Sequence, residues 1–598
     1  MKVFKGYRIG QLLMVAAVLA IYAQAMGFGF LRFDDPDYTF ACPFVKDGLS
    51  WSNVCEAFRN VRHGAVWMPF TWISYMVDVS LFGRGAVGHH LVNVALHLAN
   101  ALLLLRLTLG IYGNSNGPNA LKGLNVGVLL VLFWALHPQR IEAVAWIASR
   151  KELLWAFFVL IGLLAWREGK SIVALVCCAL ACMSKPTAMV FPFLALIVGQ
   201  QNCEMAQTNP EPLKPLTDLR SFMAQNALRS LKPLLALCLM FAISLATGAL
   251  AIYSQTHPEG MAAKDLFYAP LGERLLNAMV AVGLYLVQMI VPVGIHLDYR
   301  AVPGGWPLHG ALGLLAFVMV TLGVCWCFLK AIKGSRVLNC LKAIMFFMLA
   351  LLPTLGLFGS FGEHARADRF LYVPAMAMPL FLSGFGATKA RNAIKALLFG
   401  VVVIFAIQSF RLTVTYRDDL SAFSRTLACD SNHGRALAHV GEARCAAGVL
   451  DEGIDLLRRS CAVRPRDATD GKLAYALMRL GRADDWDEIR AICAPYAADP
   501  ARDAKGQALE ALGTAELKSR DWPNAALHLS RSILAPARFY SSADAKLKLA
   551  YAWHNGGRRS DARKLFEAIA QSSRADLASK AEEVLSVLER SPGALLFW

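Results

Sequence analysis

The feature of this sequence that most constrains its fold is a series of long apolar runs within the first 414 residues. A helix needs about 20 apolar residues to cross the roughly 30 Å hydrocarbon core of a bilayer. Runs near this length occupy 9–31, 90–112, 120–137, 151–166, 233–254, 309–330, 337–358, 369–388 and 392–414. A further run, 171–199, is broken by Ser184-Lys185-Pro186, which predicts either two short spans meeting at a polar turn or one kinked span. The sequence therefore predicts an all-α polytopic membrane helix bundle over residues 1–414.

Composition agrees with this fold class. Of 598 residues, 56% are hydrophobic and 17% are charged, and the mean hydropathy is +0.44, which excludes a disordered chain or a disulfide-stapled miniprotein. Residues 1–414 hold 33 Lys and Arg against 18 Asp and Glu, whereas residues 415–598 hold 27 against 25. Because the excess positive charge is scattered between apolar runs, it indicates cytoplasmic loops rather than a nucleic-acid surface, and we expect no nucleic-acid partner.

Loop charge predicts the topology. Lys2, Lys5 and Arg8 place the N-terminus in the cytoplasm, so segment 32–88 is an outer loop. The first run is too long for a cleaved signal peptide and lacks a small-residue cleavage site. Basic clusters at 167–170, 214–232, 330–336 and 389–395 all face the cytoplasm only if the Ser184 break separates two crossings and 274–292 does not span. We therefore expect eleven spans, a re-entrant or interfacial helix at 274–292 inside a large outer loop 255–308, and an outer C-terminal domain.

Residues 415–598 predict a soluble helical repeat array. From about residue 430, small residues recur at the offsets of tetratricopeptide (TPR) repeats, where they let two helices cross closely. The first unit, 436–465, is followed by three more at offsets of roughly 33 to 39 residues. The positions that carry this pattern are Gly441, Gly448, Gly453, Leu457 and Pro465, then Gly481, then Gly513, Ala525 and Leu529, then Gly557, Ala562 and Phe566. Such an array is either a packing scaffold or a concave groove for a peptide or partner domain.

Cysteine placement fits an oxidising compartment without fixing any bond. Of 14 cysteines, eight lie in or beside apolar runs and six would lie outside. These six are Cys42, Cys55, Cys429, Cys445, Cys461 and Cys493. An even number permits disulfides, with Cys42 to Cys55 the most local choice, but the connectivity stays open. No Cys/His spacing indicates a zinc site.

Three carboxylates, Asp34, Asp35 and Asp37, follow directly after the first apolar run. A solvent-exposed turn would explain them without any function. At a membrane-embedded cavity, however, one could act as a general base with a raised pKa while another holds a divalent cation.

Further polar groups gather at the predicted outer ends of spans. They are His137, Arg140 and Glu142, then Arg150, Lys151 and Glu152, then Lys185, then His364, Arg366, Asp368 and Arg369. Each alone is explained by interfacial snorkelling or an ion pair, since charges at this depth are costly. Together they provide a base for an acceptor hydroxyl and cations for a departing lipid phosphate. His89, His90, Asn93 and His97 fit interhelical hydrogen bonds better than a metal site.

Seven sequence blocks, in order, carry a family resemblance. They are FDDPDY at 33–38, WMPFTWISY at 67–75, HHLVNVALHLANALLL at 89–104, HPQRIEAVAWIASRKELL at 137–154, MSKP at 183–186, HARADRFLYVP at 364–374 and YRDDLSAFSRTL at 416–427. With the repeats that follow, the chain resembles the GT-C superfamily of polyprenyl-phosphate-sugar-dependent glycosyltransferases. More closely, it resembles the transmembrane and TPR-containing protein O-mannosyltransferase-like family and its bacterial relatives.

The resemblance implies an enzyme that transfers a hexose, mannose in this family, from a polyprenyl-phosphate donor to a hydroxyl acceptor by inverting single displacement. Asp34 or Asp35 would be the catalytic base and, if a metal such as Mg or Mn takes part, its ligand. Arg150, Lys151, Lys185, Arg366 and Arg369 would neutralise the donor phosphate. Asp37, Arg140, Glu142, His364 and Asp368 would support the site or the acceptor.

The same resemblance implies a bacterial inner-membrane protein with a periplasmic repeat domain. Its acceptor would be Ser or Thr of exported proteins or peptides, bound through the TPR groove. Two alternatives remain open from the sequence. One is the same chemistry on a glycan or lipid acceptor, and the other is a membrane-anchored TPR scaffold without enzymatic activity.

Overall fold

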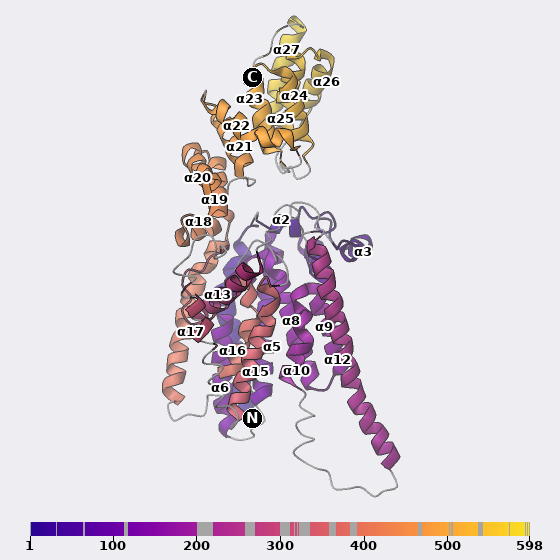
Figure 1. Ribbon diagram of the computed structural model, residues 1–598, viewed down its shortest axis with the longest axis vertical. Helices are drawn as coiled ribbons and strands as arrows, with labels where there is room; N and C mark the ends of the chain where they lie inside the picture. The colour runs from indigo at the N-terminus through magenta and orange to yellow at the C-terminus, as the bar shows by residue number, and fades with distance from the viewer. Residues whose placement is uncertain are drawn as a thin grey trace. The chain divides into compact units, whose positions relative to one another are not determined.

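The computed structural model describes residues 2–596 with several gaps. The gaps are at 32, 62, 64–65, 113–117, 200–218, 257–269, 300–310, 312, 316, 320, 322–334, 358–365, 383–390, 464–468, 483, 501–502, 504–505, 536–541, 573, 593 and 595. The chain divides into two compact units, residues 1–425 and 426–598 (Figure 1). The sequence places the same division at 414 and 415. The described residues form helices, with one isolated antiparallel bridge between Tyr299 and Arg366, so the all-α prediction is confirmed.

The first unit is a helix bundle in which most of the expected apolar runs are helical. Its longer helices are α1 (Lys2–Tyr22), α4 (Pro69–Phe82), α5 (Ala86–Tyr112), α6 (Pro118–Ala135), α8 (Arg150–Arg167), α9 (Ser171–Ser184), α12 (Leu219–Thr256), α13 (Leu271–Ile290), α15 (Ser335–Leu351) and α17 (Arg391–Thr413). Short elements between them are α2 (Asp35–Tyr38), α3 (Trp51–Arg59), η2 (Pro138–Arg140), α7 (Ile141–Ala145), η3 (Ile147–Ser149), η4 (Pro186–Val190), α10 (Phe191–Val198), η9 (Asp368–Leu371), η10 (Pro374–Met376) and α16 (Ala377–Leu382). The segment expected as the first outer loop, 32–88, thus holds three helices.

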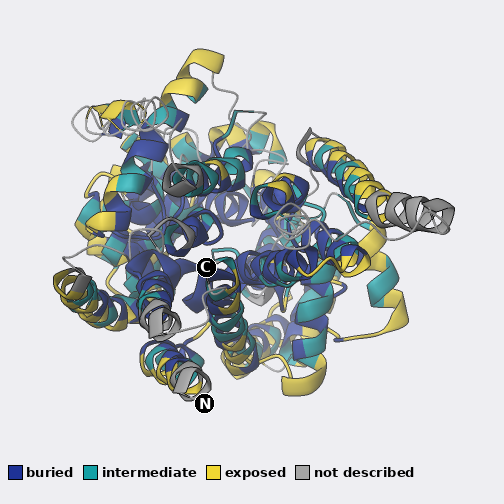
Figure 2. Ribbon diagram, turned by 90° about the horizontal axis from the view of Figure 1, so that it is seen from below, coloured by how far each residue is buried: buried dark blue, intermediate teal, exposed yellow. Residues whose placement is uncertain are grey.

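The outward faces of the bundle are apolar. Exposed side chains on α12 include Leu231, Leu234, Leu235, Leu245 and Ile252, and those on α17 include Leu397, Phe399, Ile404, Ile407 and Phe410. Figure 2 shows buried residues on the inward faces of such helices and exposed ones on the faces that point away. Exposed apolar surface of this extent is unfavourable in water and is expected of helices that face lipid.

Fewer of the described helices than the expected eleven are long and apolar enough to cross a membrane by length and composition. Five described helices are long and apolar enough to cross a membrane, and a sixth is formed if α6 and α7, bent by 56°, count as one span. Helix α8 carries Arg150, Lys151, Glu152 and Arg167, too many charges for an apolar span by composition. The expected run 369–388 begins with the short 3-10 helices η9 and η10, and most of 309–330 lies outside the described residues.

The expected alternation of chain direction is nevertheless visible in the contacts between helix ends. The Tyr22 hydroxyl at the end of α1 donates to Ala135 O at the end of α6, at 3.3 Å. Ser409 Oγ near the end of α17 donates to Leu136 O at 2.7 Å. Helix ends that loop charge assigns to the outer side therefore meet at one end of the bundle. Which side of the membrane this end faces stays a prediction.

The break at Ser184 separates two crossings of the bundle, as one of the two expected arrangements requires. Lys185, just after α9, pairs with Glu152 at the start of α8. Val198, which ends α10, accepts a hydrogen bond from Arg167 at the other end of α8, at 3.2 Å. The chain therefore runs along α8 in α9 and back again in η4 and α10. Both helices are short, since 14 residues of α9 extend only about 21 Å.

Segment 274–292 lies mostly in α13, a continuous helix of 20 residues that is long and apolar enough to span. Its last turn contacts the end of the bundle where α1 and α6 end, because His137 Nε2 lies 3.2 Å from Met289 O. Near its start, Arg274 donates to Leu357 O, just beyond α15, at 3.2 Å. In Figure 1 the helix runs obliquely. Its re-entrant or interfacial placement stays a prediction.

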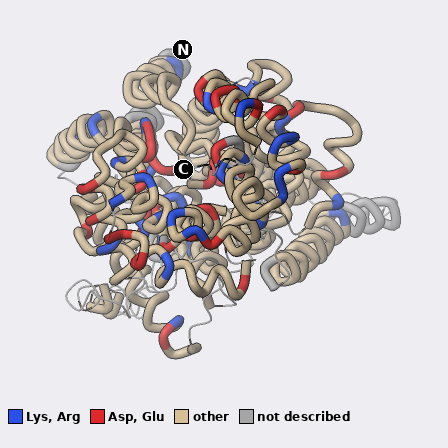
Figure 3. The backbone as a smooth tube through the Cα atoms, turned by 90° about the horizontal axis from the view of Figure 1, so that it is seen from above, with Lys and Arg blue, Asp and Glu red and all other residues tan. Residues whose placement is uncertain are grey.

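The second unit confirms the helical repeat array. Four helical hairpins follow one another, and a final helix packs on the last of them. They are α19 (Gly434–Ala446) with α20 (Leu450–Val463), α21 (Thr469–Leu480) with α22 (Asp485–Ala498), α23 (Gln507–Lys518) with α24 (Trp522–Ile533), α25 (Ser542–Asn555) with α26 (Arg559–Ala570), and α27 (Ala575–Arg590). A Cβ atom on Gly441 would lie 2.9 Å from Gly453 O, so the expected close helix crossing is present. Lys, Arg, Asp and Glu are interspersed along these helices (Figure 3).

The most local disulfide choice is absent from the structure. Both Cys42 and Cys55 are free cysteines, the first buried and the second half-buried. The four other cysteines expected outside form no disulfide either: Cys429, Cys445, Cys461 and Cys493. Cys445 and Cys493 pack within the apolar core of the repeats, where they act as small apolar side chains.

Candidate functional site

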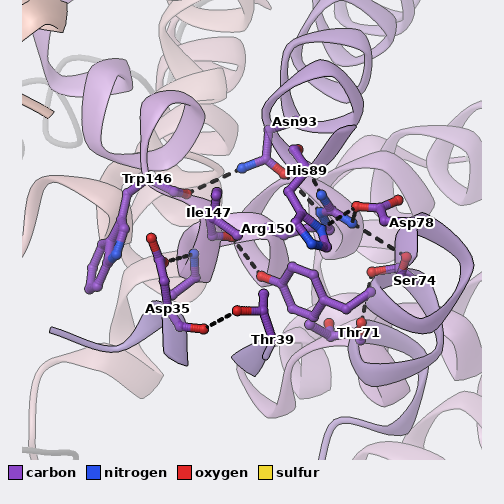
Figure 4. Close-up of polar contacts among 12 residues, drawn as sticks. Asp35, Thr39, Thr71, Ser74, Asp78, His89, Asn93, Trp146, Ile147 and Arg150 are labelled. Carbon is purple, nitrogen blue, oxygen red and sulfur yellow. Dashed lines mark hydrogen bonds and ion pairs between the residues drawn. The ribbon is translucent and has the colours of Figure 1, made fainter. Parts of the chain in front are cut away.

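The acidic segment after α1 separates its three carboxylates into different surroundings. Asp35 begins the short helix α2 and is buried, with Oδ2 accepting from Leu31 N at 2.7 Å and Oδ1 accepting from Ala148 N at 2.8 Å. Its side chain therefore joins the end of the first span to the segment before α8 (Figure 4). Asp37 is exposed, and Asp34 is half-buried.

Two opposing effects set the pKa of the Asp35 carboxyl. Burial raises its pKa to about 8, and the nearby carboxylates of Asp34 and Asp419 act in the same direction. The backbone N–H groups of Leu31 and Ala148 oppose this shift because they stabilise the ionised form. With both oxygens engaged by backbone donors, Asp35 holds the loop in place and offers no oxygen atom without a partner.

Asp34 faces two cations. Its carboxylate interacts electrostatically with the Lys151 ammonium and the Arg369 guanidinium. Among the described residues it forms no hydrogen bond or ion pair that fixes either oxygen. Of the two aspartates expected as a base, Asp34 is thus the one that combines partial exposure with positively charged neighbours.

Lys151 lies beside Asp34 without a carboxylate partner at hydrogen-bond distance in the described structure. Its Nζ donates to the Tyr38 hydroxyl at 2.6 Å and lies 4.3 Å from the centroid of the Tyr38 ring. Tyr38 is in turn held by Trp72, whose ring centroid is 5.0 Å away. A half-buried ammonium bound to a neutral hydroxyl can accept an additional anion without first breaking an ion pair.

Two more cations complete the cluster, and each has a buried carboxylate partner. Lys185 pairs with Glu152, and Arg369 pairs with Glu142, whose second oxygen accepts from the Arg369 backbone N–H at 2.8 Å. The ring of Phe370 lies between them, 5.0 Å from Lys185 Nζ and 4.9 Å from the Arg369 guanidinium. We call Asp34, Lys151, Lys185 and Arg369 the Asp34 cluster. These residues come from four segments: Asp34 from the loop after α1, Lys151 from the start of α8, Lys185 from the break that follows α9, and Arg369 from η9.

Arg150, also expected at the phosphate, lies in a separate buried network. Its guanidinium pairs with Asp78 of α4, donates to Asn93 Oδ1 at 2.8 Å and donates to His89 O at 2.7 Å. His89 Nδ1 is 2.7 Å from Asp78 Oδ2, and Asn93 donates to Trp146 O at 3.2 Å. Figure 4 shows this Arg150 network on the other side of Ile147 from Asp35. The interhelical hydrogen bonds expected of His89 and Asn93 are confirmed.

The remaining expected residues form a third group around η9. Arg366 donates to Gln288 Oε1 at 2.7 Å and stacks 3.9 Å from the centroid of Tyr299. Asp368 is buried and accepts from the Tyr299 hydroxyl at 2.7 Å. Arg140 is buried and donates to Leu371 O at 2.6 Å. His364 lies outside the described residues.

The described side chains do not fit a metal site built on the aspartate pair. No three His, Cys, Asp or Glu side chains gather closely enough to hold a metal ion in the described ranges. Both Asp35 oxygens already accept backbone N–H groups, which leaves Asp34 as a single candidate ligand. Hard cations such as Mg²⁺ prefer several oxygen ligands.

Three residues that the sequence did not single out shape the site. Tyr38 holds Lys151, Asp78 neutralises Arg150, and Trp146 lies against Arg369, whose guanidinium is 5.0 Å from the indole centroid. Asp78 carried a usable signal, since a lone carboxylate within an apolar helix needs a buried partner. Trp146 carries a further feature: its indole N–H is buried without a described acceptor, which costs about 1–3 kcal/mol.

The fold and site thus define a multi-pass membrane protein with a helical repeat domain and a charged cluster at one end of its bundle. No family model matches the chain. It is 21% identical to the protein O-mannosyl-transferase F38B6.6 of Caenorhabditis elegans over 443 residues, which cover 70% of this chain and 58% of that protein. It is 22% and 24% identical to the protein O-mannosyl-transferases TMTC4 of Mus musculus and Homo sapiens, in each case over 64% of this chain and 56% of the relative.

These relatives confirm the resemblance to the transmembrane and TPR-containing O-mannosyltransferase-like family. The chain spans a little more than half the length of the curated relatives it matches. Among solved structures, yeast Tom70 is 12% identical and covers 82% of this chain and 97% of its own, but with a TM-score of 0.18, and no inference rests on it.

Proposed function

We propose that this chain is a membrane glycosyltransferase that moves a hexose, mannose in view of the relatives' names, from a polyprenyl-phosphate donor to a hydroxyl of an exported protein. The observation that carries the proposal is the Asp34 cluster: a half-buried carboxylate within electrostatic range of Lys151 and Arg369, with Lys151 held by Tyr38. A base next to cations is the arrangement that transfer from a lipid phosphate needs.

The reaction would be an inverting single displacement. The Asp34 carboxylate takes the proton of the acceptor hydroxyl while that oxygen bonds to the anomeric carbon. The bond between the anomeric carbon and the phosphate oxygen breaks, and its electron pair leaves with polyprenyl phosphate. No covalent enzyme intermediate is required because the phosphate is already a good leaving group.

The cations divide the work of stabilising the leaving phosphate. Lys151 is the first candidate because its bond to Tyr38 leaves its charge without a carboxylate partner in the described structure. Glu142 holds Arg369 in position, and Glu152 holds Lys185. These two cations contribute positive electrostatic potential without being the first contact of the phosphate. Arg150 is excluded from direct contact in this scheme because its donors are taken by Asp78, Asn93 and His89.

We further propose that the Asp34 cluster faces the extracytoplasmic side of a bacterial inner membrane and that the repeats recruit the protein acceptor in a periplasmic groove. Scattered cytoplasmic Lys and Arg support this orientation. The names of the relatives support a protein acceptor. This scheme uses no Mg or Mn ion, since Asp34 alone would offer a carboxylate ligand from the aspartate pair.

The test is to incubate the purified full chain with labelled hexosyl polyprenyl phosphate and candidate peptides. The proposal requires release of polyprenyl phosphate and label on Ser or Thr. Label on a glycan or lipid instead would keep the chemistry and change the acceptor. No release with any acceptor would favour a scaffold. Full release by the Asp34→Asn, Asp35→Asn double variant would remove the proposed mechanism.

A further inference from the structure

Two buried polar groups beside Arg369 have no partner among the described residues. They are the Trp146 indole N–H and the Tyr416 hydroxyl, on side chains that are 1% and 3% exposed. Trp146 lies under the Arg369 guanidinium, 5.0 Å from centroid to Cζ. Tyr416 interacts electrostatically with Arg369 and Glu142. Trp146 therefore contacts the Asp34 cluster, and Tyr416 lies within electrostatic range of it.

These two groups are suited to hydroxyls rather than to a phosphate charge. An indole N–H can only donate, and a phenol can donate or accept, so together they can bind ligand oxygens of either kind. Buried polar groups normally have partners, and an exception at a site calls for an explanation such as a missing ligand.

The surroundings of Trp146 are aromatic, which narrows the ligand class. Phe33 stacks on Trp146 with centroids 5.7 Å apart and planes at 25°. Phe423 packs edge-on against Phe33, also at 5.7 Å. A hexose ring has both apolar C–H faces, which suit aromatic side chains, and hydroxyls, which suit an indole N–H. A bare phosphate has neither.

We propose that Trp146 and Tyr416 form the sugar subsite of the donor site, where they bind hydroxyls of the hexose and contribute to the choice of sugar. The inference rests on the proposed function, since the ligand is the hexosyl end of the polyprenyl-phosphate donor. The phosphate lies toward Lys151, the sugar lies toward Trp146 and Tyr416, and the anomeric carbon between them lies within reach of the Asp34 side.

The experiment removes single donors in the full-length protein: Tyr416→Phe keeps the ring, and Trp146→Phe also replaces the indole with a smaller phenyl ring. Trp67→Phe is the matched control, because the Trp67 N–H already donates to Phe58 O at 3.1 Å in the loop before α4. The measurements are the ligand-free melting temperature, the KM for hexosyl polyprenyl phosphate, and the KM for donors in which one sugar hydroxyl at a time is replaced by hydrogen.

The subsite predicts an unchanged or raised melting temperature for Tyr416→Phe, because its hydroxyl has no described partner within the protein. Trp146→Phe should melt lower, because the smaller phenyl ring leaves a cavity in place of the buried indole. For both variants the subsite predicts a KM about 10-fold higher for the intact donor. Each variant should also discriminate less against one particular deoxy sugar, since a lost protein donor no longer penalises the missing hydroxyl. Trp67→Phe should retain the wild-type KM and the wild-type discrimination.

Two results would overturn the subsite. An unchanged KM in both variants would show that neither group contacts the donor, and unchanged discrimination among deoxy donors would show that they do not touch the sugar. Either result, with wild-type turnover intact, leaves the proposed function standing. If wild-type protein neither binds nor consumes the donor, the proposed function and the subsite fail together.

Discussion

Arg150 and Lys151 are neighbours in sequence, yet they belong to two polar clusters. The clusters differ in whether each charged side chain has an ion-pair partner. The Arg150 network is closed: Asp78, Asn93 and His89 engage its guanidinium in a fully buried setting. The Asp34 cluster is open: Lys151 binds a neutral hydroxyl, and Asp34 meets its cations without a described hydrogen bond. A closed buried network stabilises one arrangement of helices, whereas an open one leaves electrostatic capacity for a ligand.

The largest effect on stability should come from opening the closed network. Arg150→Met leaves Asp78 buried without its cation and should lower the free energy of unfolding by about 3–5 kcal/mol. Thermal unfolding in detergent would measure it. The Asp78→Asn, Arg150→Met double variant should recover part of the loss, since no uncompensated charge remains. An Arg150→Met protein as stable as wild type would contradict the comparison.

Lys151 and Lys185 test the open cluster as a matched pair. Lys151→Met should lower kcat/KM for the donor about 100-fold, or roughly 2.7 kcal/mol, with little change in melting temperature, because no described carboxylate loses its partner. Lys185→Met should lower activity and stability together, since Glu152 is then buried unpaired. Steady-state kinetics and melting curves on the same preparations would show the split. Equal stability losses in both variants would show that Lys151, like Lys185, stabilises the fold.

Asp35 should contribute to stability in a pH-dependent way. Its folded pKa of about 8 lies above the ordinary value, so the folded state keeps a proton that the unfolded chain releases. The sign follows: the stabilisation is full below about pH 4 and is lost as the pH rises toward 8. Asp35→Asn should cost about 2 kcal/mol at pH 5, because one backbone N–H loses its acceptor, and less at pH 8.5. A constant difference across this range would refute the protonated form.

The smallest expected effect on stability is in the repeats, and it depends on packing rather than on charge. Gly441→Ala would place a Cβ atom 2.9 Å from Gly453 O and Leu457 Cγ, which should destabilise the protein by about 1 kcal/mol. Gly471→Ala is the control, since its nearest neighbour would lie 3.5 Å away at ordinary contact distance. It should be neutral or slightly stabilising because alanine favours a helix. Equal effects at the two glycines would argue against the close crossing.

The sequence predicts much of the fold because apolar length and glycine spacing are local properties. The apolar runs, the break at Ser184 and the four helical hairpins all follow from such patterns. Fewer of the described helices than expected qualify as spans by length and composition, because charges at the start of α8 and irregular backbone in η9 shorten the apolar segments.

The sequence alone does not predict which residue of the site has which role. Asp34 and Asp35 are adjacent and chemically identical, and burial and the backbone N–H groups of Leu31 and Ala148, the second 113 positions away, distinguish them. The same holds for Arg150 and Lys151, since the Asp78 partner lies on a helix inside the segment expected as a loop. Roles of this kind depend on long-range contacts that sequence spacing does not encode.

The most direct test of this account is the rate of polyprenyl phosphate release by Asp34→Asn, measured beside Asp35→Asn and wild type with melting temperatures recorded for each. We predict that Asp34→Asn melts like wild type and releases lipid phosphate at least about 100-fold more slowly, since it lacks the general base. An Asp34→Asn enzyme that is folded and works at the wild-type rate would contradict the assignment of the open cluster as the catalytic site.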